Sequence, residues 1–258
     1  MNAEIEFDGF VRSEPTYDGV TRPVYRAGGG PAVLVIHEVP GLHPRVIAFA
    51  RRVLAAGFTV HMPSLLGEPG KPSTGGYRLA SMARACVRRE FATWATGKTS
   101  PIVGWLRGLA RDAHGACGGP GVGAVGMCLT GGFALAMAVD DVMVAPVLSQ
   151  PSLPFPVTAA QRRDLGLSAA DLDRVCARDV EVMGLRFTAD RAVPDERFAT
   201  LRARLGDRFL AVEIDSRPGN PHGLPRSAHS VLTYAQDTEP TRAAEDQVIA
   251  FFRRKLSA

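Results

Sequence analysis

A chain of 258 residues, 46% of them hydrophobic, is long enough to bury a large core. No stretch approaches the ~18–20 consecutive apolar residues of a membrane helix, and the acidic first residues lack the apolar core of a secretion signal. The net charge of +4 comes from arginine pairs scattered along the chain, which disfavours nucleic-acid binding. Four cysteines without a CxxC pair build no disulfide framework. We therefore expect a reduced, cytoplasmic protein that binds neither membranes nor nucleic acids.

The first part of the chain alternates strand and helix patterns. Residues 4–11 and 20–26 flank a turn-like PTYDG sequence and predict an antiparallel strand pair. The run AVLVI at 32–36 is continuously apolar, as in a central parallel strand that is buried on both faces. A helix over 43–56 with one apolar face and a strand over 58–62 follow. This order predicts a right-handed parallel crossover.

A long irregular segment separates these elements from the middle of the chain. Residues 63–76 are rich in Pro, Gly and Ser and follow the carboxyl end of a strand, where open α/β sheets bind their ligands. Helical patterns over 77–96 and 101–114 come next. We expect the segment 63–120 to cap the binding pocket or to line it.

The second half of the chain repeats the alternation. Strands are predicted at 121–125, 142–148, 180–187 and 209–214, and helices at 133–139, 168–177, 195–205 and 241–255. No repeat, low-complexity tract or linker interrupts this pattern. The sequence therefore predicts one α/β domain over residues 1–258, with a mostly parallel central sheet flanked by helices.

The run GMCLTGG at 126–132 joins a predicted buried strand to a predicted buried helix. A sharp strand–turn–helix junction with a nucleophilic side chain is the nucleophile elbow of the α/β-hydrolase fold, here with Cys128 in place of serine. The strained backbone of the nucleophile requires small residues two positions before and after it. Gly126 fits this rule, whereas Thr130 departs from it. The alternative for Cys128 is a buried thiol that opens a core helix.

An acid and a base are predicted to act with Cys128. A thiol with a pKa near ~8.5 needs a base to become a nucleophile, and a carboxylate orients the imidazole that serves as this base. Asp190 follows a predicted strand, and two histidines follow the last strand, so the chain order is nucleophile, acid, histidine, as in the hydrolase fold. Asp195 is the rival acid, but its position at the start of a helix is typical of a first-turn residue.

We predict His229 as the base. It lies in the apolar-flanked sequence AHSV at 228–231, which suits a turn that packs against the core. His222 is the alternative: it lies between two prolines that stiffen its loop, and a glycine follows it. His37 and His61, at the ends of predicted strands, are expected to be core or pocket-wall residues.

Essentially the whole chain, residues 5–255, resembles the dienelactone hydrolase family. The stretches that carry the resemblance are VIHEVPGL (35–42), the elbow GMCLTGG (126–132), TADRAVP (188–194) and AHSV (228–231). A cysteine elbow together with a glutamate after the third strand is specific, since most α/β-hydrolases have serine and a His-Gly motif at these places. The resemblance implies an α/β-hydrolase fold and the hydrolysis of cyclic enol lactones or other esters without a metal or organic cofactor.

The resemblance also implies roles for residues around the elbow. Glu38 matches the family's glutamate, which hydrogen-bonds the resting thiol and deprotonates it when substrate binds. The backbone N–H groups of Val39 and Leu129 match the family's oxyanion hole. A carboxylate beside a thiolate would raise the pKa of the thiol, whereas a neutral thiol can donate a hydrogen bond to it.

We therefore predict a hydrolase of a small ester or lactone, carboxymethylenebutenolidase-like, that forms a cysteine thioester acyl-enzyme as a monomer or homodimer. Two alternatives remain open. The first is a catalytically impaired hydrolase-fold protein that binds a ligand, which the threonine of the elbow favours. The second is a thiol redox protein in which Cys128 reacts with peroxide, although no resolving cysteine lies near it in the sequence.

Overall fold

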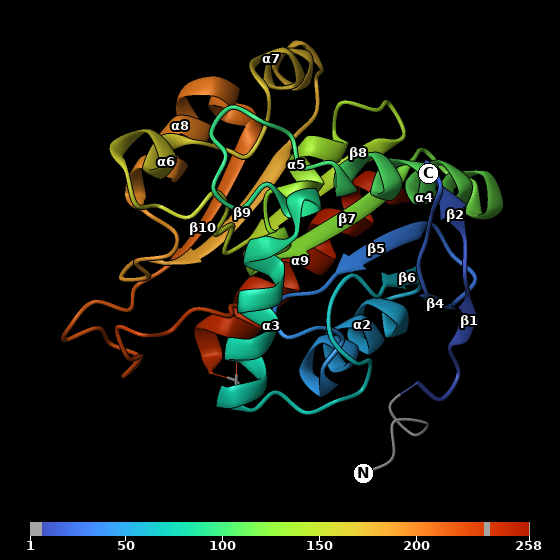
Figure 1. The fold of residues 1–258 in the computed structure, drawn as a ribbon, viewed down its shortest axis with the longest axis horizontal. Coiled ribbons are helices and arrows are strands. Elements are labelled where there is room, and N and C mark those ends of the chain that lie inside the picture. Colours follow the sequence, from blue (N-terminus) through green and yellow to red (C-terminus); the bar gives the residue numbers. More distant parts are fainter. Residues whose placement is uncertain (1–6, 235–237, 258) are drawn as a thin grey trace.

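The computed structural model describes residues 7–234 and 238–257, and an eight-stranded sheet forms its centre (Figure 1). The strand order is β1-β4-β6-β5-β7-β8-β9-β10. From β6 to β10 neighbouring strands are parallel, whereas β4 is antiparallel to both β1 and β6. The sequence prediction of a mostly parallel α/β sheet is thus confirmed. The strands are β1 (Val11–Ser13), β2 (Thr16–Tyr17), β3 (Val20–Thr21), β4 (Val24–Ala27), β5 (Ala32–Ile36), β6 (Thr59–Pro63), β7 (Val122–Met127), β8 (Met143–Ser149), β9 (Val182–Phe187) and β10 (Phe209–Ile214).

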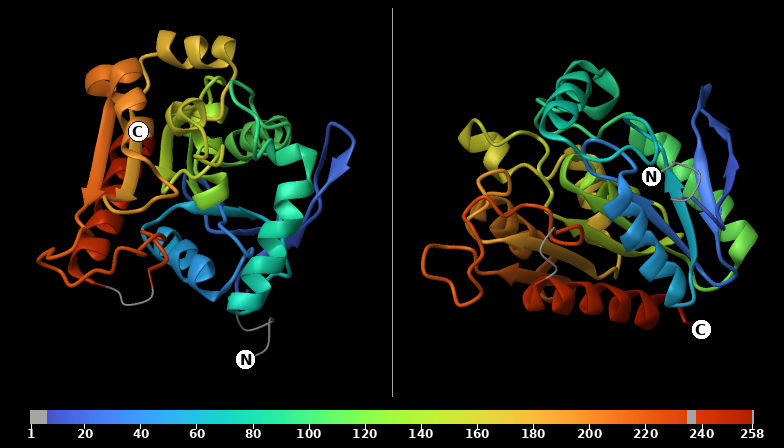
Figure 2. Two further views of the ribbon diagram at one scale, coloured as in Figure 1. Left: turned by 60° about the vertical axis from the view of Figure 1, so that its left-hand side comes forward. Right: turned by 90° about the horizontal axis from the view of Figure 1, so that it is seen from below.

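Helices cover both faces of the sheet (Figure 2). They are α2 (Pro44–Ala55), α3 (Gly75–Val87), α4 (Ile102–Cys117), α5 (Phe133–Met137), α6 (Ala159–Arg163), α7 (Ala169–Ala177), α8 (Asp195–Leu205) and α9 (Glu239–Leu256), with short 3-10 turns η1 (Arg89–Phe91), η2 (Cys128–Thr130) and η3 (Gly206–Arg208). The buried side chains of α2 and α9 form one core cluster, and those of α4, α5, α7 and α8 form the other. No helix in the described ranges is long and apolar enough to span a bilayer.

The continuous apolar run of β5 is explained by this layering. Val33 and Val35 belong to the core cluster under α2 and α9, whereas Leu34 and Ile36 belong to the cluster on the opposite face. Successive side chains of a strand point to opposite faces, so a strand with both faces buried needs no polar alternation. β7 likewise lies between β5 and β8, and its carboxyl end leads into the predicted nucleophile elbow.

The structure differs from the sequence prediction at three places near the N-terminal strands and α3. The predicted N-terminal strand over 4–11 begins only at Val11, and its residues 4–6 lie outside the described part. The PTYDG sequence forms its own hairpin of β2 and β3, because Asp18 and Gly19 both adopt positive φ, at +52° and +74°. The predicted helix over 77–96 ends at Val87 and is followed by η1.

Helix α6 was absent from the sequence prediction. Its start is marked by a capping box, in which the Thr158 hydroxyl accepts from the Gln161 backbone N–H and the Gln161 side chain accepts from the Thr158 N–H. Five residues are too few for a hydrophobic period to show, so the cap was the available signal.

Candidate active site

A cavity of about 810 Å³ opens at the carboxyl edge of the sheet. Glu38 follows β5, Cys128 follows β7 and Asp190 follows β9, and all three line this cavity together with His229. Because β5, β7 and β9 are parallel, their carboxyl ends meet at the same edge of the sheet. The helix α3 and the loop before it form another wall of the cavity, with Arg78, Leu79 and Met82 among the lining side chains.

Cys128 lies in a left-handed backbone conformation with φ +55°, which is costly for a residue with a Cβ atom. The thiol-bearing residue is buried, directly after the last residue of β7. A Cβ at Gly126 would lie 2.2 Å from the Thr130 carbonyl oxygen, and a Cβ at Gly131 would lie 2.5 Å from the Pro151 Cα. The elbow can therefore turn this sharply because both positions are glycine.

Thr130, the residue that departs from the small-residue rule, is fully buried and ties the elbow to β5. Its hydroxyl accepts from the Met127 N–H at 2.9 Å. The same hydroxyl lies 3.0 Å from the Ile36 carbonyl oxygen and 3.1 Å from that of His37, to either of which it can donate. The Thr130 hydroxyl thus links the ends of β7 and β5 by hydrogen bonds.

His229 and Asp190 are in direct contact at the cavity. The Nδ1 of His229 lies 2.6 Å from Asp190 Oδ2, and the other carboxylate oxygen accepts from the Ala192 N–H at 2.9 Å. Burial lowers the pKa of His229, but the interactions with Cys128 and Asp190 outweigh burial and raise the pKa well above its usual range. The imidazole thus contacts a carboxylate and lines the same cavity as the Cys128 thiol, with which it can share a proton.

Glu38 is a buried carboxylate with four side-chain donors. Its Oε1 accepts from His43 Nε2 at 3.2 Å and from the Thr233 hydroxyl, and its Oε2 accepts from the Ser230 hydroxyl at 2.6 Å and from Gln150 Nε2 at 3.2 Å. Burial raises the pKa of Glu38, but the electrostatic interaction with His43 and the hydrogen bonds from His43, Ser230 and Thr233 lower the pKa to about 2. For Glu38 to accept a proton from the thiol, one of these donors would first have to leave.

The two residues with predicted oxyanion-hole N–H groups lie at the cavity that Cys128 lines. Val39 lines the cavity, and Leu129 follows Cys128 within η2. The residues that the sequence offered as rivals lie elsewhere. His222 Nδ1 lies 3.9 Å from a carboxylate oxygen of Glu239, and Asp195 opens α8 and pairs with Arg186.

Two residues of the site were missed by the sequence reasoning. His43 was assigned to the start of a helix, where it is indeed the N-cap of α2, but its side chain turns back to Glu38. The sequence pattern predicts no role for Gln150, although this residue directly follows β8 as Cys128 follows β7. It is fully buried at φ +36°, and its Oε1 accepts from the Val231 N–H at 3.2 Å in the loop that carries His229. A polar residue immediately after a buried strand was the signal that could have found it.

Over the described ranges, no group of three or more His, Cys, Asp and Glu side chains is arranged to hold a metal ion. What the site offers is a thiol, an imidazole and two carboxylates at one sheet edge. This set can perform nucleophilic acyl transfer without further groups.

Known structures share the fold of this chain at low sequence identity. A structure assigned to a dienelactone hydrolase from Klebsiella pneumoniae subsp. pneumoniae MGH 78578 has a TM-score of 0.65 and 17% identity, covering 95% of this chain and 99% of that one. A dienelactone hydrolase-like promiscuous phosphotriesterase from metagenomic libraries has a TM-score of 0.61 and 18% identity, covering 96% and 98%. A cold-adapted esterase from an Arctic intertidal metagenomic library has a TM-score of 0.59 and 14% identity, covering 95% and 93%.

A search of curated proteins found no match. The sequence profile of the Dienelactone hydrolase family, in contrast, matches residues 20–256, which include every element from β3 to α9. The chain belongs to the dienelactone hydrolase family.

Proposed function

We propose that the protein hydrolyses a small carboxylic ester or lactone, in the manner of a carboxymethylenebutenolidase, through a thioester on Cys128. Membership of the dienelactone hydrolase family supports a hydrolase. The observation that supports the cysteine mechanism is the grouping in the cavity: Cys128 and His229 both line it, and His229 Nδ1 lies 2.6 Å from Asp190 Oδ2. The strained backbone of Cys128 supports the same role, since strain of this kind is found at functional sites.

Acylation starts from the pair of Cys128 thiolate and His229 imidazolium, which forms when the thiol proton passes to the imidazole, as the raised pKa of His229 favours. The thiolate attacks the carbonyl carbon of the substrate, and the carbonyl oxygen becomes an oxyanion that accepts from the N–H groups of Val39 and Leu129. The C–O bond to the leaving group then breaks, and the departing alkoxide takes the proton from His229. With a lactone, the alcohol stays attached to the acyl group. Asp190 stabilises the imidazolium during both proton transfers.

Deacylation repeats these steps with water. His229 takes a proton from a water molecule, whose oxygen attacks the thioester carbonyl carbon. The second oxyanion collapses, the C–S bond breaks, and the Cys128 sulfur takes the proton back from His229. The product is the carboxylic acid, and the enzyme returns to its starting protonation state. The same imidazole therefore serves both halves of the reaction.

The test is intact-protein mass spectrometry after incubation with a panel of esters and lactones. A mass increase that equals the acyl group and maps to Cys128 is expected, together with turnover that is lost in Cys128→Ala. His229→Ala should lose acylation and deacylation together, because one base serves both steps. His222→Ala is the matched control and should keep kcat, since its side chain pairs toward Glu239 rather than Asp190.

Three outcomes would contradict this function. Turnover that persists in purified Cys128→Ala excludes the cysteine mechanism. A wild type that binds esters without turnover points to the ligand-binding alternative. Oxidation of Cys128 by peroxide without any ester hydrolysis points to the redox alternative.

A further inference from the structure

His37 lies between β5 and Glu38 and is fully buried. Its Nδ1 is 2.8 Å from the carbonyl oxygen of Glu38, and its Nε2 is 2.9 Å from the Leu65 nitrogen and 3.3 Å from the Leu66 nitrogen. A carbonyl can only accept and a backbone N–H can only donate, so the ring carries its proton on Nδ1 and is neutral. Burial agrees with this assignment, because it lowers the pKa of His37 to about 4.

The Glu38 carbonyl and the Val39 N–H are the two polar ends of one peptide group. This peptide is trans, so the two bonds point in opposite directions. A side chain that fixes the direction of the carbonyl therefore also fixes the direction of the N–H. Glu38 and Val39, the two residues that this peptide joins, both line the cavity that contains Cys128.

We propose that His37 is a positioning residue of the oxyanion hole: by holding the Glu38 carbonyl, it directs the Val39 N–H toward the oxyanion formed at Cys128. This inference rests on the proposed function, since it needs an oxyanion to form there. His37 then has a role beyond that of a buried core residue.

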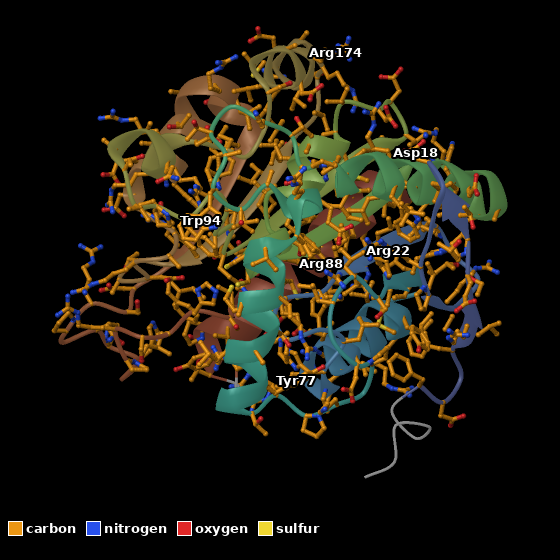
Figure 3. All side chains as sticks on the ribbon, viewed as in Figure 1. Asp18, Arg22, Tyr77, Arg88, Trp94 and Arg174 are labelled. Carbon is orange, nitrogen blue, oxygen red and sulfur yellow. The ribbon has the colours of Figure 1, made fainter. Side chains whose placement is uncertain are left out.

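The far side of the His37 ring is anchored as well. Leu65, whose N–H donates to the ring, lies between two guanidinium groups: Arg22 is 3.5 Å and Arg88 is 3.2 Å from its carbonyl oxygen. Arg22 and Arg88 both also bond to Glu90, and Figure 3 shows the two arginines side by side. The loop after β6 is therefore a fixed support for the ring.

The segment that follows β5 and the segment that follows β6 also pack backbone against backbone. Gly41 has φ +147°, and a Cβ there would lie 2.5 Å from the Leu66 carbonyl oxygen. Gly67 has φ +69°, and a Cβ there would lie 2.1 Å from the Pro40 carbonyl oxygen. The segment around Val39 thus has little freedom to adjust to a substrate, and its direction is set in advance. Such preorganised donors are worth more to catalysis than donors that must reorient.

His61 is the matched control. It lies on the neighbouring strand β6 and is also buried, and burial together with the nearby Arg26 lowers its pKa to about 4. In the described part of the chain its Nε2 has no hydrogen-bond partner, and its side chain does not line the cavity. A substitution at His61 therefore reports the cost of altering a buried histidine without disturbing the Val39 peptide.

The experiment compares His37→Phe, His37→Gln and His61→Phe with wild type on p-nitrophenyl acetate, and measures alkylation of Cys128 by iodoacetamide in parallel. Alkylation occurs at a saturated carbon and forms no oxyanion, so it reports the thiol and its base alone. In His37→Phe we expect kcat to fall about 10²-fold, the scale of losing one oxyanion donor, with the alkylation rate unchanged. His37→Gln should recover part of kcat, because its amide can both donate and accept. His61→Phe should keep wild-type kcat.

Two results would overturn the inference. One is a kcat in His37→Phe within about threefold of wild type. The other is a parallel loss of kcat and alkylation in both His37→Phe and His37→Gln, which would show that His37 supports the thiol and its base rather than the Val39 N–H. Failure of the proposed function looks different, since then wild type itself would hydrolyse p-nitrophenyl acetate no faster than Cys128→Ala.

Discussion

Among single residues, Glu38 has contacts that disagree with a role as the proton acceptor of the Cys128 thiol. A carboxylate with a pKa of about 2 is a weak proton acceptor for a thiol whose ordinary pKa is ~8.5. Its donors Ser230 and Thr233 lie on the loop that carries His229, and its donor Gln150 also accepts from Val231 of that loop. Glu38 therefore anchors the loop that carries His229. The thiol contact that the family resemblance implies needs a second arrangement of the same side chain.

This anchoring predicts a specific dependence of stability on pH. Folding lowers the pKa of Glu38 from an ordinary 4.5 to about 2, so the folded state gains stability above pH 4.5 and loses this gain as the pH falls toward 2. Glu38→Gln should lower the free energy of unfolding at pH 7 by roughly 2–4 kcal/mol. The amide NH₂ group of glutamine can only donate, and it would face side chains that donate to the Glu38 carboxylate. The difference from wild type should shrink between pH 4.5 and pH 3, as measured by urea unfolding.

Glu68→Gln is the control for this measurement. Its carboxylate is 70% exposed and pairs with Lys71 on the surface, so its removal should change stability little at any of these pH values. A Glu38→Gln variant whose deficit stays constant from pH 7 to pH 3 would contradict the assignment of a low pKa to Glu38.

At the scale of elements, α8 supports the elbow through one buried arginine. Arg197 is 1% exposed, and its guanidinium donates to four backbone carbonyls, those of Pro151, Pro154, Gln161 and Asp164. The loop that Arg197 holds also contacts Cys128, since the Ser152 N–H donates to the Cys128 carbonyl at 3.0 Å. Burial lowers the pKa of Arg197 to about 10, which still leaves the side chain charged at neutral pH.

Arg197→Met should therefore destabilise the fold by about 3 kcal/mol or more, because it leaves several buried carbonyls without donors. Arg197→Lys should recover little of this loss, since an ammonium cannot match the planar fork. Urea unfolding checks both variants. Arg162→Lys, at an exposed pair with Glu196, is the control and should change stability far less. If Arg197→Lys were as stable as Arg162→Lys, the planar guanidinium of Arg197 would not be needed to hold the four carbonyls.

Elements differ in how well the sequence predicts them. The helix over 195–205 and the strand over 209–214 were predicted with their observed bounds, because apolar periodicity and a terminating glycine mark them locally. The chain order of Cys128, Asp190 and His229 was also readable, since each follows a buried strand or its loop. The donors to Glu38 were not readable, because they depend on a left-handed Gln150 and on a long loop that returns to the sheet. No local pattern encodes such contacts.

The whole molecule is organised by one sheet with a core cluster on each face. Every strand from β4 to β10 in the order of the sheet is hydrogen-bonded to the next, and each cluster draws side chains from early and late parts of the chain. The candidate site depends on this arrangement, because its residues follow separate strands of the sheet. Glu38, Cys128, Asp190 and His229 come from four separate stretches, so they meet only when the sheet is complete. The chemistry proposed for the site is thus a property of the assembled sheet rather than of any one motif.

This organisation predicts that structure and activity are lost together. Far-UV circular dichroism, ester hydrolysis and tryptophan fluorescence should all change at the same urea concentration, as expected for a single cooperative domain. Fluorescence is informative because Trp105 is 2% exposed in the core cluster of α4, whereas Trp94 is 55% exposed and should respond little. Trp94→Phe removes the second signal and serves as the control. Two separate transitions, with activity lost before the Trp105 signal changes, would instead show that the site-bearing loops unfold as a unit of their own.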